Sequence, residues 1–135
     1  MTFKYNDVYL EEVSSVAGPL EEQGPLGKNY DITYKDYYMG MNTWEQAESK
    51  MLVDSVDALL YKVNKLKQDI DVHISGDLLN QIVSTNYASL SINIPLIGVY
   101  GACSTSCLGL IVGSNMVDKG QVRNAIVSTS SHNNS

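Results

Sequence analysis

The residues best suited to chemistry in this sequence surround Cys103. A short apolar run, 95–100, precedes it and begins at Pro95, as is typical of a strand buried on both faces. Gly101 and Ala102 then permit a sharp turn, and Ser104 opens a run of hydroxyl residues that commonly cap helices. A thiol at a helix start lies near unpaired N–H groups and the positive end of the helix dipole, which favour the thiolate. The pattern therefore predicts a nucleophile elbow.

A second interpretation of Cys103 stays open, because an unpaired cysteine is often only a small buried hydrophobic residue. The other cysteine, Cys107, lies one helical turn further on. Such a pair forms neither a disulfide framework nor a metal-ligand set, so we expect no metal and no cofactor. An intracellular, reducing setting fits this cysteine usage.

Length and composition limit the classes of protein to consider. The chain has 135 residues, which corresponds to one domain or part of one, and 44% of them are hydrophobic, enough for a packed core. Its 9 basic and 15 acidic residues give a net charge of −6, which argues against nucleic-acid binding because phosphate neutralisation needs a basic face. No apolar stretch is long enough to be a transmembrane segment, and the first ten residues lack a signal-peptide pattern.

The N-terminal third shows one strand and a long irregular stretch. Residues 8–16 mix apolar and polar side chains and are expected to form a first strand, which Gly18 and Pro19 end. Residues 18–42 show no clean period and contain four tyrosines. We expect an extended loop there, which either wraps over another surface and serves function or packs as a crossover on its own domain.

The clearest helix begins after Thr43, which has capping-box spacing to Gln46. A stripe of apolar residues at helical spacing then extends to Val63. Further expected elements alternate: a strand at 70–75, a turn at Gly76 and Asp77, a helix at 78–88, the strand 95–100, a helix at 103–118 and a strand at 123–128. Such alternation predicts an α/β fold with a mainly parallel sheet and right-handed crossovers.

The helix after Cys103 has an unusual composition. It is apolar on every face and carries Gly109 and Gly113 four residues apart, which allows another backbone to approach closely. A helix that is apolar all round must be covered all round. We therefore expect a central buried helix that lies between layers.

Four motifs carry a resemblance to a known family. They are G-P-L-G at 24–27, G-D-L-L-N-Q at 76–81, G-A-C-S-T-S at 101–106 and S-T-S-S-H-N at 128–133. Together they resemble the stage V sporulation protein AD family, which has the fold of thiolases and beta-ketoacyl synthases, over residues 13–133. The resemblance implies that residues 1–135 are the N-terminal half of a thiolase-like fold, with helices on both faces of the sheet. Because the second half is absent, we expect a truncated or partial form.

The resemblance also implies a function. Members of the family are regarded as binding proteins for dipicolinic acid that act in its uptake during sporulation and its release at germination. It implies a location in the forespore and spore, peripheral to the spore inner membrane, with other components of the membrane transport complex as partners. It further implies a homodimer formed through residues 95–101, from Pro95 to Gly101.

The expected ligand pocket lies around Cys103. A carboxylate of dipicolinate would face the N–H groups of Cys103, Ser104 and Thr105, because helix N-termini favour anions. Asp77 and Asn80 follow another strand's end and are weaker candidates; Asp77 would have to face away from the ligand or cap a helix.

The two histidines have different expected roles. His132 follows a strand's carboxyl end, where ligands of parallel sheets gather, and its role in the pocket is left open. His73 lies within a predicted strand and is expected to be structural. The alternative function is acyl transfer by Cys103, as in thiolases and beta-ketoacyl synthases. It requires a catalytic base, and neither histidine occupies a position expected for one. We therefore expect a binding protein that is not an enzyme.

Overall fold

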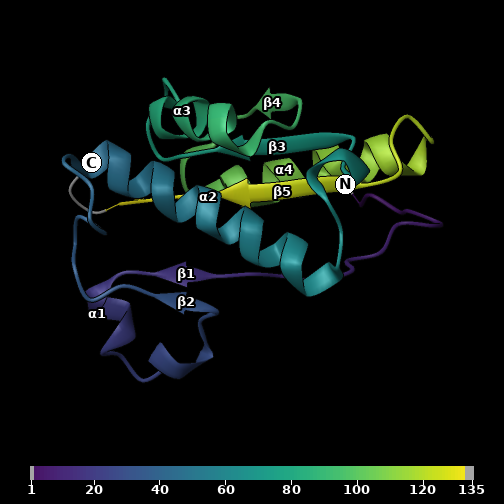
Figure 1. Cartoon of the computed structure of the whole chain (residues 1–135). Helices are drawn as coiled ribbons and strands as arrows, with labels where there is room; N and C mark the ends of the chain where they lie inside the picture. The colour runs from purple at the N-terminus through teal and green to yellow at the C-terminus, as the bar shows by residue number, and fades with distance from the viewer. Residues whose placement is uncertain (1, 133–135) are drawn as a thin grey trace.

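The structure is a computed structural model that describes residues 2–132, and its helices and strands largely alternate along the chain (Figure 1). The strands are β1 (Val16–Ala17), β2 (Ile32–Thr33), β3 (Val72–Gly76), β4 (Leu96–Gly98) and β5 (Ala125–Thr129). The α-helices are α1 (Pro19–Glu22), α2 (Trp44–Val63), α3 (Val83–Ile92) and α4 (Thr105–Asp118). Short 3₁₀ turns occupy Gly27–Asn29, Lys67–Asp69 and Ala102–Ser104.

The main sheet has the order β4-β3-β5, with all three strands parallel. His73 of β3 is aligned with Leu96 of β4 on one side and with Ile126 of β5 on the other. Helices α2 and α3 cover one face of this sheet and α4 covers the other (Figure 1). The predicted α/β class, with a parallel sheet between helices, is confirmed.

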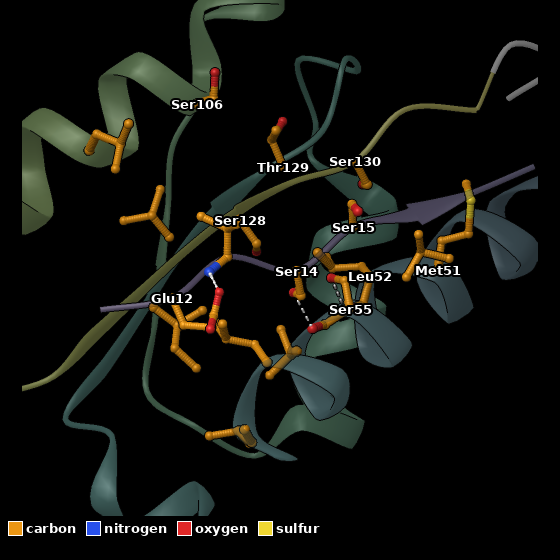
Figure 2. Close-up of a pocket in the computed structure, with 18 of the residues that line it drawn as sticks. Glu12, Ser14, Ser15, Met51, Leu52, Ser55, Ser106, Ser128, Thr129 and Ser130 are labelled. Atoms are coloured by element: carbon orange, nitrogen blue, oxygen red, sulfur yellow. Dashed lines mark hydrogen bonds between the residues drawn. The ribbon is translucent and has the colours of Figure 1, made fainter. Parts of the chain in front are cut away.

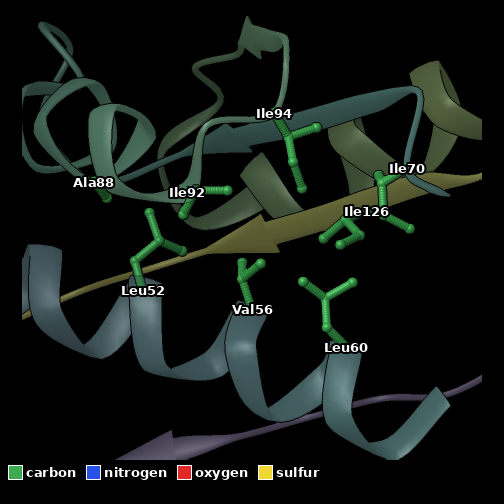
Figure 3. Close-up of a cluster of buried hydrophobic side chains, with 8 residues drawn as sticks. All are labelled: Leu52, Val56, Leu60, Ile70, Ala88, Ile92, Ile94 and Ile126. Carbon is green, nitrogen blue, oxygen red and sulfur yellow. The ribbon is translucent and has the colours of Figure 1, made fainter. Parts of the chain in front are cut away.

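The core lies between the main sheet and the helices α2 and α3 (Figure 3). It consists of aliphatic side chains and one alanine: Leu52, Val56, Leu60, Ile70, Ala88, Ile92, Ile94 and Ile126. The three members from α2 belong to the apolar stripe that the sequence shows. Burying a side chain of this size stabilises the fold by about 1.5–3 kcal/mol, so this stripe fixes α2 against the sheet.

Helix α2 begins at the predicted cap. Thr43 Oγ1 accepts a hydrogen bond from Gln46 N at 3.3 Å. The Gln46 side chain reaches one residue further back than a capping box requires and accepts from Asn42 N at 3.2 Å. The helix ends at Asn64, which adopts the left-handed conformation with φ of 52°.

The N-terminal region differs from the prediction. The strand expected at 8–16 is reduced to β1, which pairs in parallel with β2. The residues before β1 are anchored by α2, since Lys62 Nζ donates to Val13 O at 2.6 Å and Ser14 Oγ donates to Ser55 O at 2.7 Å. Within residues 18–42, where the sequence shows no period, the structure places α1, one 3₁₀ turn and β2.

Helix α3 begins later than residue 78, where the sequence places it. Asp77 is fully buried, and its carboxylate accepts hydrogen bonds from Leu79 N and Thr85 N, both at 3.0 Å. The intervening residues form a turn that ends at Ile82, with φ of 46°. Asp77 therefore caps α3 across this turn, which moves the helix towards the C-terminus.

Helix α4 lies against the sheet through its two glycines. A Cβ atom at Gly109 would lie 2.6 Å from Val127 Cγ1, and one at Gly113 would lie 3.2 Å from Ile74 Cδ1. Two other residues of this helix are more open to solvent: Leu110 is 49% exposed and Ile111 is 37% exposed. The expected burial of this helix is thus present on the sheet side, while the outer side meets solvent in these 135 residues.

Candidate functional site

The turn before α4 is fixed by hydroxyl groups. Thr105 Oγ1 accepts from Gly101 N at 3.1 Å and donates to Ala102 O at 2.7 Å. Ser104 Oγ donates to Gly101 O at 2.6 Å. Ala102 is held at φ of 47°, an unfavourable value for a residue with a Cβ, immediately before Cys103. The result is a sharp turn that leaves Cys103 exposed at the start of α4.

The amide groups of the same turn are largely in use. Ser104 N donates to Gly101 O at 2.9 Å, and Thr105 N donates to Ala102 O. These two of the three amides that were expected to face a carboxylate are therefore bonded within the turn. The positive end of the dipole of the 14-residue helix α4 still lies at this turn.

Gly76 allows β3 to end against the elbow. A Cβ atom at this position would lie 1.9 Å from Val99 O and 2.9 Å from Thr105 Cγ2. Because β3 is the middle strand, this contact fixes the ends of β3 and β4 and the start of α4 relative to one another. Asp77 follows directly, with both carboxylate oxygens turned towards backbone amides of the α3 turn, and Asn80 is exposed.

A buried polar row lies under α2 and α3, on the side of β3 that carries His73 and Ser75. His73 Nε2 lies 2.6 Å from Ser128 Oγ, which in turn donates to Ser75 Oγ at 2.8 Å. Among the described residues, His73 Nδ1 is a buried atom without a hydrogen-bond partner. Burial lowers the pKa of His73 from 6.5 to about 4, so this imidazole is neutral at neutral pH.

The row continues into α2 at Glu48, which is 1% exposed. Its Oε1 accepts from Ser130 Oγ at 2.8 Å and its Oε2 from Ser84 Oγ at 3.3 Å. The sequence alone did not reveal this network around Glu48. The available signal was the alternation of His73, Ser75 and Asp77 along one strand, which puts their side chains on the same face.

His132 lies in an aromatic cluster at the start of α2. Its Nε2 lies 3.0 Å from Tyr37 O, and its ring is 5.1 Å from that of Trp44. The ring of Tyr38 also stacks on that of Trp44, with 3.9 Å between the ring centroids. This cluster fastens the end of the irregular stretch to the segment that follows β5. His132 thus belongs to a group separate from the turn around Cys103.

A large cavity of about 1260 Å³ opens between the N-terminal segment, α2, α4 and β5 (Figure 2). Ser14 and Ser15 lie on one side of it and Ser128 and Thr129 on another. His132 also lines this cavity. The other candidate residues do not line it: Asp77, Asn80, Cys103, Ser104 and Thr105.

The arrangement of the strands and helices defines a thiolase-like fold. The chain is similar in structure to 3-oxoacyl-[acyl-carrier-protein] synthase III from Aquifex aeolicus VF5, with a TM-score of 0.57 and 14% sequence identity. The similarity covers 63% of this chain and 30% of that chain. The predicted thiolase-like fold is confirmed.

Sequence comparison narrows the class to one family. The family model for stage V sporulation protein AD matches residues 1–135. The chain is also 41% identical over 126 residues to stage V sporulation protein AD from Bacillus subtilis (strain 168). The chain therefore belongs to the stage V sporulation protein AD family, as the motifs predicted. It spans 37% of the length of this relative.

Proposed function

We propose that this chain is a dipicolinate-binding component of the spore transport machinery, acting in dipicolinate uptake during sporulation and release at germination. Membership of a sporulation protein family supports the setting. The observation that carries the binding site is Cys103, exposed beside the start of α4 at the carboxyl edge of the parallel sheet. Ligands of open parallel sheets bind at that edge.

The dianionic ligand is drawn by the helix field and contacts Cys103. Because the amides of Ser104 and Thr105 already bond within the turn, their part is to hold Cys103 in position. Asp77 directs both carboxylate oxygens at backbone amides of the α3 turn, which keeps them away from the ligand's carboxylates. Asn80 is exposed in the turn that follows β3, where its side-chain amide can donate a hydrogen bond to a carboxylate of the ligand.

Filling the space beside Cys103 should weaken dipicolinate binding. We expect Cys103→Tyr to weaken dipicolinate affinity at least tenfold in isothermal titration calorimetry, because the ring occupies the place of the ligand. The matched control is Ser91→Tyr, which adds the same ring to an exposed residue that precedes β4, at the opposite end of the sheet. Equal affinities for Cys103→Tyr and the control would remove the site from the elbow.

We further propose that Cys103 binds without forming a covalent intermediate. Acyl transfer needs a base in reach of the thiol. His73 is buried against Ser128, and His132 lies against Tyr37 and Trp44. Incubation with an acyl thioester followed by intact-mass measurement should leave the chain unmodified. A stoichiometric acyl adduct on Cys103 would instead establish the acyl-transfer alternative.

For association, we propose a homodimer through residues 95–101, which surround the edge strand β4, beside the other components of the transport complex at the spore inner membrane. An unpaired edge strand readily pairs with another chain. Ile97→Lys should shift the light-scattering mass from dimer to monomer. Leu90→Lys, on an exposed residue of α3, should leave it unchanged. A folded Ile97→Lys dimer would contradict this arrangement.

No helix within residues 2–132 is both long and apolar enough to cross a bilayer.

A further inference from the structure

Residues 78–117 form a stretch without charge. It contains no aspartate, glutamate, lysine, arginine or histidine, so all 9 basic and 15 acidic residues of the chain lie outside it. The stretch includes α3, β4, the turn before α4 and nearly all of α4. A dianion bound beside Cys103 therefore meets no lysine or arginine from these elements. Contacts with the body of the ligand must supply affinity that a salt bridge would supply elsewhere.

Two tyrosines belong to this stretch, and Tyr100 is the one next to the elbow. It follows β4 and directly precedes the turn that begins at Gly101. Its side chain is 47% exposed. Pairing with β3 continues beyond the last residue of β4, since Val99 N donates to Ser75 O at 2.9 Å. The backbone that carries Tyr100 is thus held against the middle strand of the sheet.

The alternation of side chains along this strand gives the face to which Tyr100 belongs. A Cβ atom at Gly98 would lie 2.4 Å from Ile82 Cδ1, so this face of β4 meets the turn that precedes α3. Successive side chains of a strand point to opposite faces. Tyr100, two residues after Gly98, therefore lies on the same face and nearer the carboxyl edge. Asn80 is exposed in the turn on that face.

The rim formed by Asn80, Tyr100 and Cys103 is open, because none of the three lines the large cavity. An open rim offers a ligand one surface, whereas a cavity holds it from several sides. On one surface a planar ring gains most from a planar partner, which it can meet by offset stacking. A tyrosine ring provides such a surface at a low cost in conformational entropy, because it has only two χ angles.

We propose that Tyr100 makes the elbow specific for planar aromatic dicarboxylates. Its ring stacks on the pyridine ring of dipicolinate, the Asn80 side chain donates to one carboxylate, and the other carboxylate lies beside Cys103. An aliphatic dicarboxylate with the same spacing of its carboxyl groups keeps the contact with Asn80 and loses the stack. This role rests on the dipicolinate binding proposed above, and it adds the feature that the site recognises.

Isothermal titration calorimetry of the 135-residue chain tests the stack. Tyr100→Leu removes the ring and should weaken dipicolinate affinity by about tenfold, in the range measured for the loss of one aromatic stack. Tyr100→Phe keeps the ring and should bind within about threefold of the wild type. Tyr87→Leu is the matched control, because it removes a tyrosine that is 66% exposed on α3, and its affinity should be unchanged.

Glutarate separates a specific role from a structural one. Its two carboxyl groups are joined by three atoms, as in dipicolinate, but it has no ring. The wild-type chain should bind glutarate about tenfold more weakly than dipicolinate, and Tyr100→Leu should lose this preference. Peptide-mapped alkylation of Cys103, which is exposed, should proceed at the wild-type rate in Tyr100→Leu if the turn is intact.

The possible results distinguish this role from the function on which it rests. Wild-type dipicolinate affinity in Tyr100→Leu would overturn the role of Tyr100 and leave dipicolinate binding in place. An equal loss for glutarate, or an equal loss in Tyr100→Phe, would do the same. Absence of saturable dipicolinate binding by the wild-type chain would refute the proposed function itself, and the role of Tyr100 with it.

Discussion

Gly76→Ala should destabilise the chain by about 3 kcal/mol or more and disorder the elbow. The added Cβ would lie 1.9 Å from Val99 O, and a carbonyl in the backbone cannot move aside as a flexible side chain can. Overpacking in a well-packed core typically costs about 1–3 kcal/mol and occasionally more. Here the clash would push the ends of β3 and β4 apart. The added Cβ would also contact the side chain of Thr105, whose hydroxyl holds the turn before α4.

Urea unfolding with circular dichroism measures this effect. Gly18→Ala is the matched control, because its added Cβ would meet atoms no closer than 3.5 Å and its φ of −83° suits any residue. We expect the control to lower the free energy of unfolding by only about 1 kcal/mol or less, because alanine is a poorer N-cap than glycine for the short helix α1. Equal stability of the two variants would show that Gly76 does not fix the elbow.

The chain should lose stability as the pH falls from 7.5 to 5. Burial lowers the pKa of His73 to about 4 in the folded chain, against 6.5 for an unperturbed histidine. Between these values the unfolded state binds more protons, so stability present at neutral pH is lost as the pH falls through 6.5 towards 4. The contribution of His73 to the free energy of unfolding falls by about 2 kcal/mol between pH 7.5 and 5, because one pKa unit corresponds to about 1.36 kcal/mol.

His73→Gln should remove most of this slope, because glutamine can still hydrogen-bond Ser128 and does not titrate. The carboxyl groups of Asp31, Asp71 and Asp118 have pKa values lowered below 3.8 by their hydrogen bonds, so their contribution is lost only at lower pH. Urea unfolding of both proteins at pH 7.5 and 5 compares the slopes. An unchanged slope in His73→Gln would mean that the buried imidazole does not control it.

The fold could be predicted because its signals are local. The apolar stripe and the cap at Thr43 determine α2, and the alternation of strands and helices determines the parallel sheet. The start of α3 could not be predicted, since it depends on Asp77 accepting from an amide eight residues away. The strand expected at 8–16 was too long because alternating side chains do not reveal whether a neighbouring strand is present to pair with it.

The elbow was predicted from residue types alone, and the structure adds what spacing does not show. The hydroxyls that look like helix caps bond the turn before the helix instead. The partners of His73 and Glu48 come from residues distant in sequence, so the buried polar row required the packed structure. The position of His132 beside Trp44 likewise depends on how the irregular stretch closes over α2.

The most direct measurement of the central claim is an amide spectrum of the ¹⁵N-labelled chain titrated with dipicolinate. We expect the largest shifts at Cys103 and its neighbours in the turn, smaller shifts at Asn80 and none along β5. Ser91→Tyr should reproduce this pattern and Cys103→Tyr should lose it. Shifts centred on β5 or on the His132 cluster, or no saturable shifts at all, would contradict dipicolinate binding at the elbow.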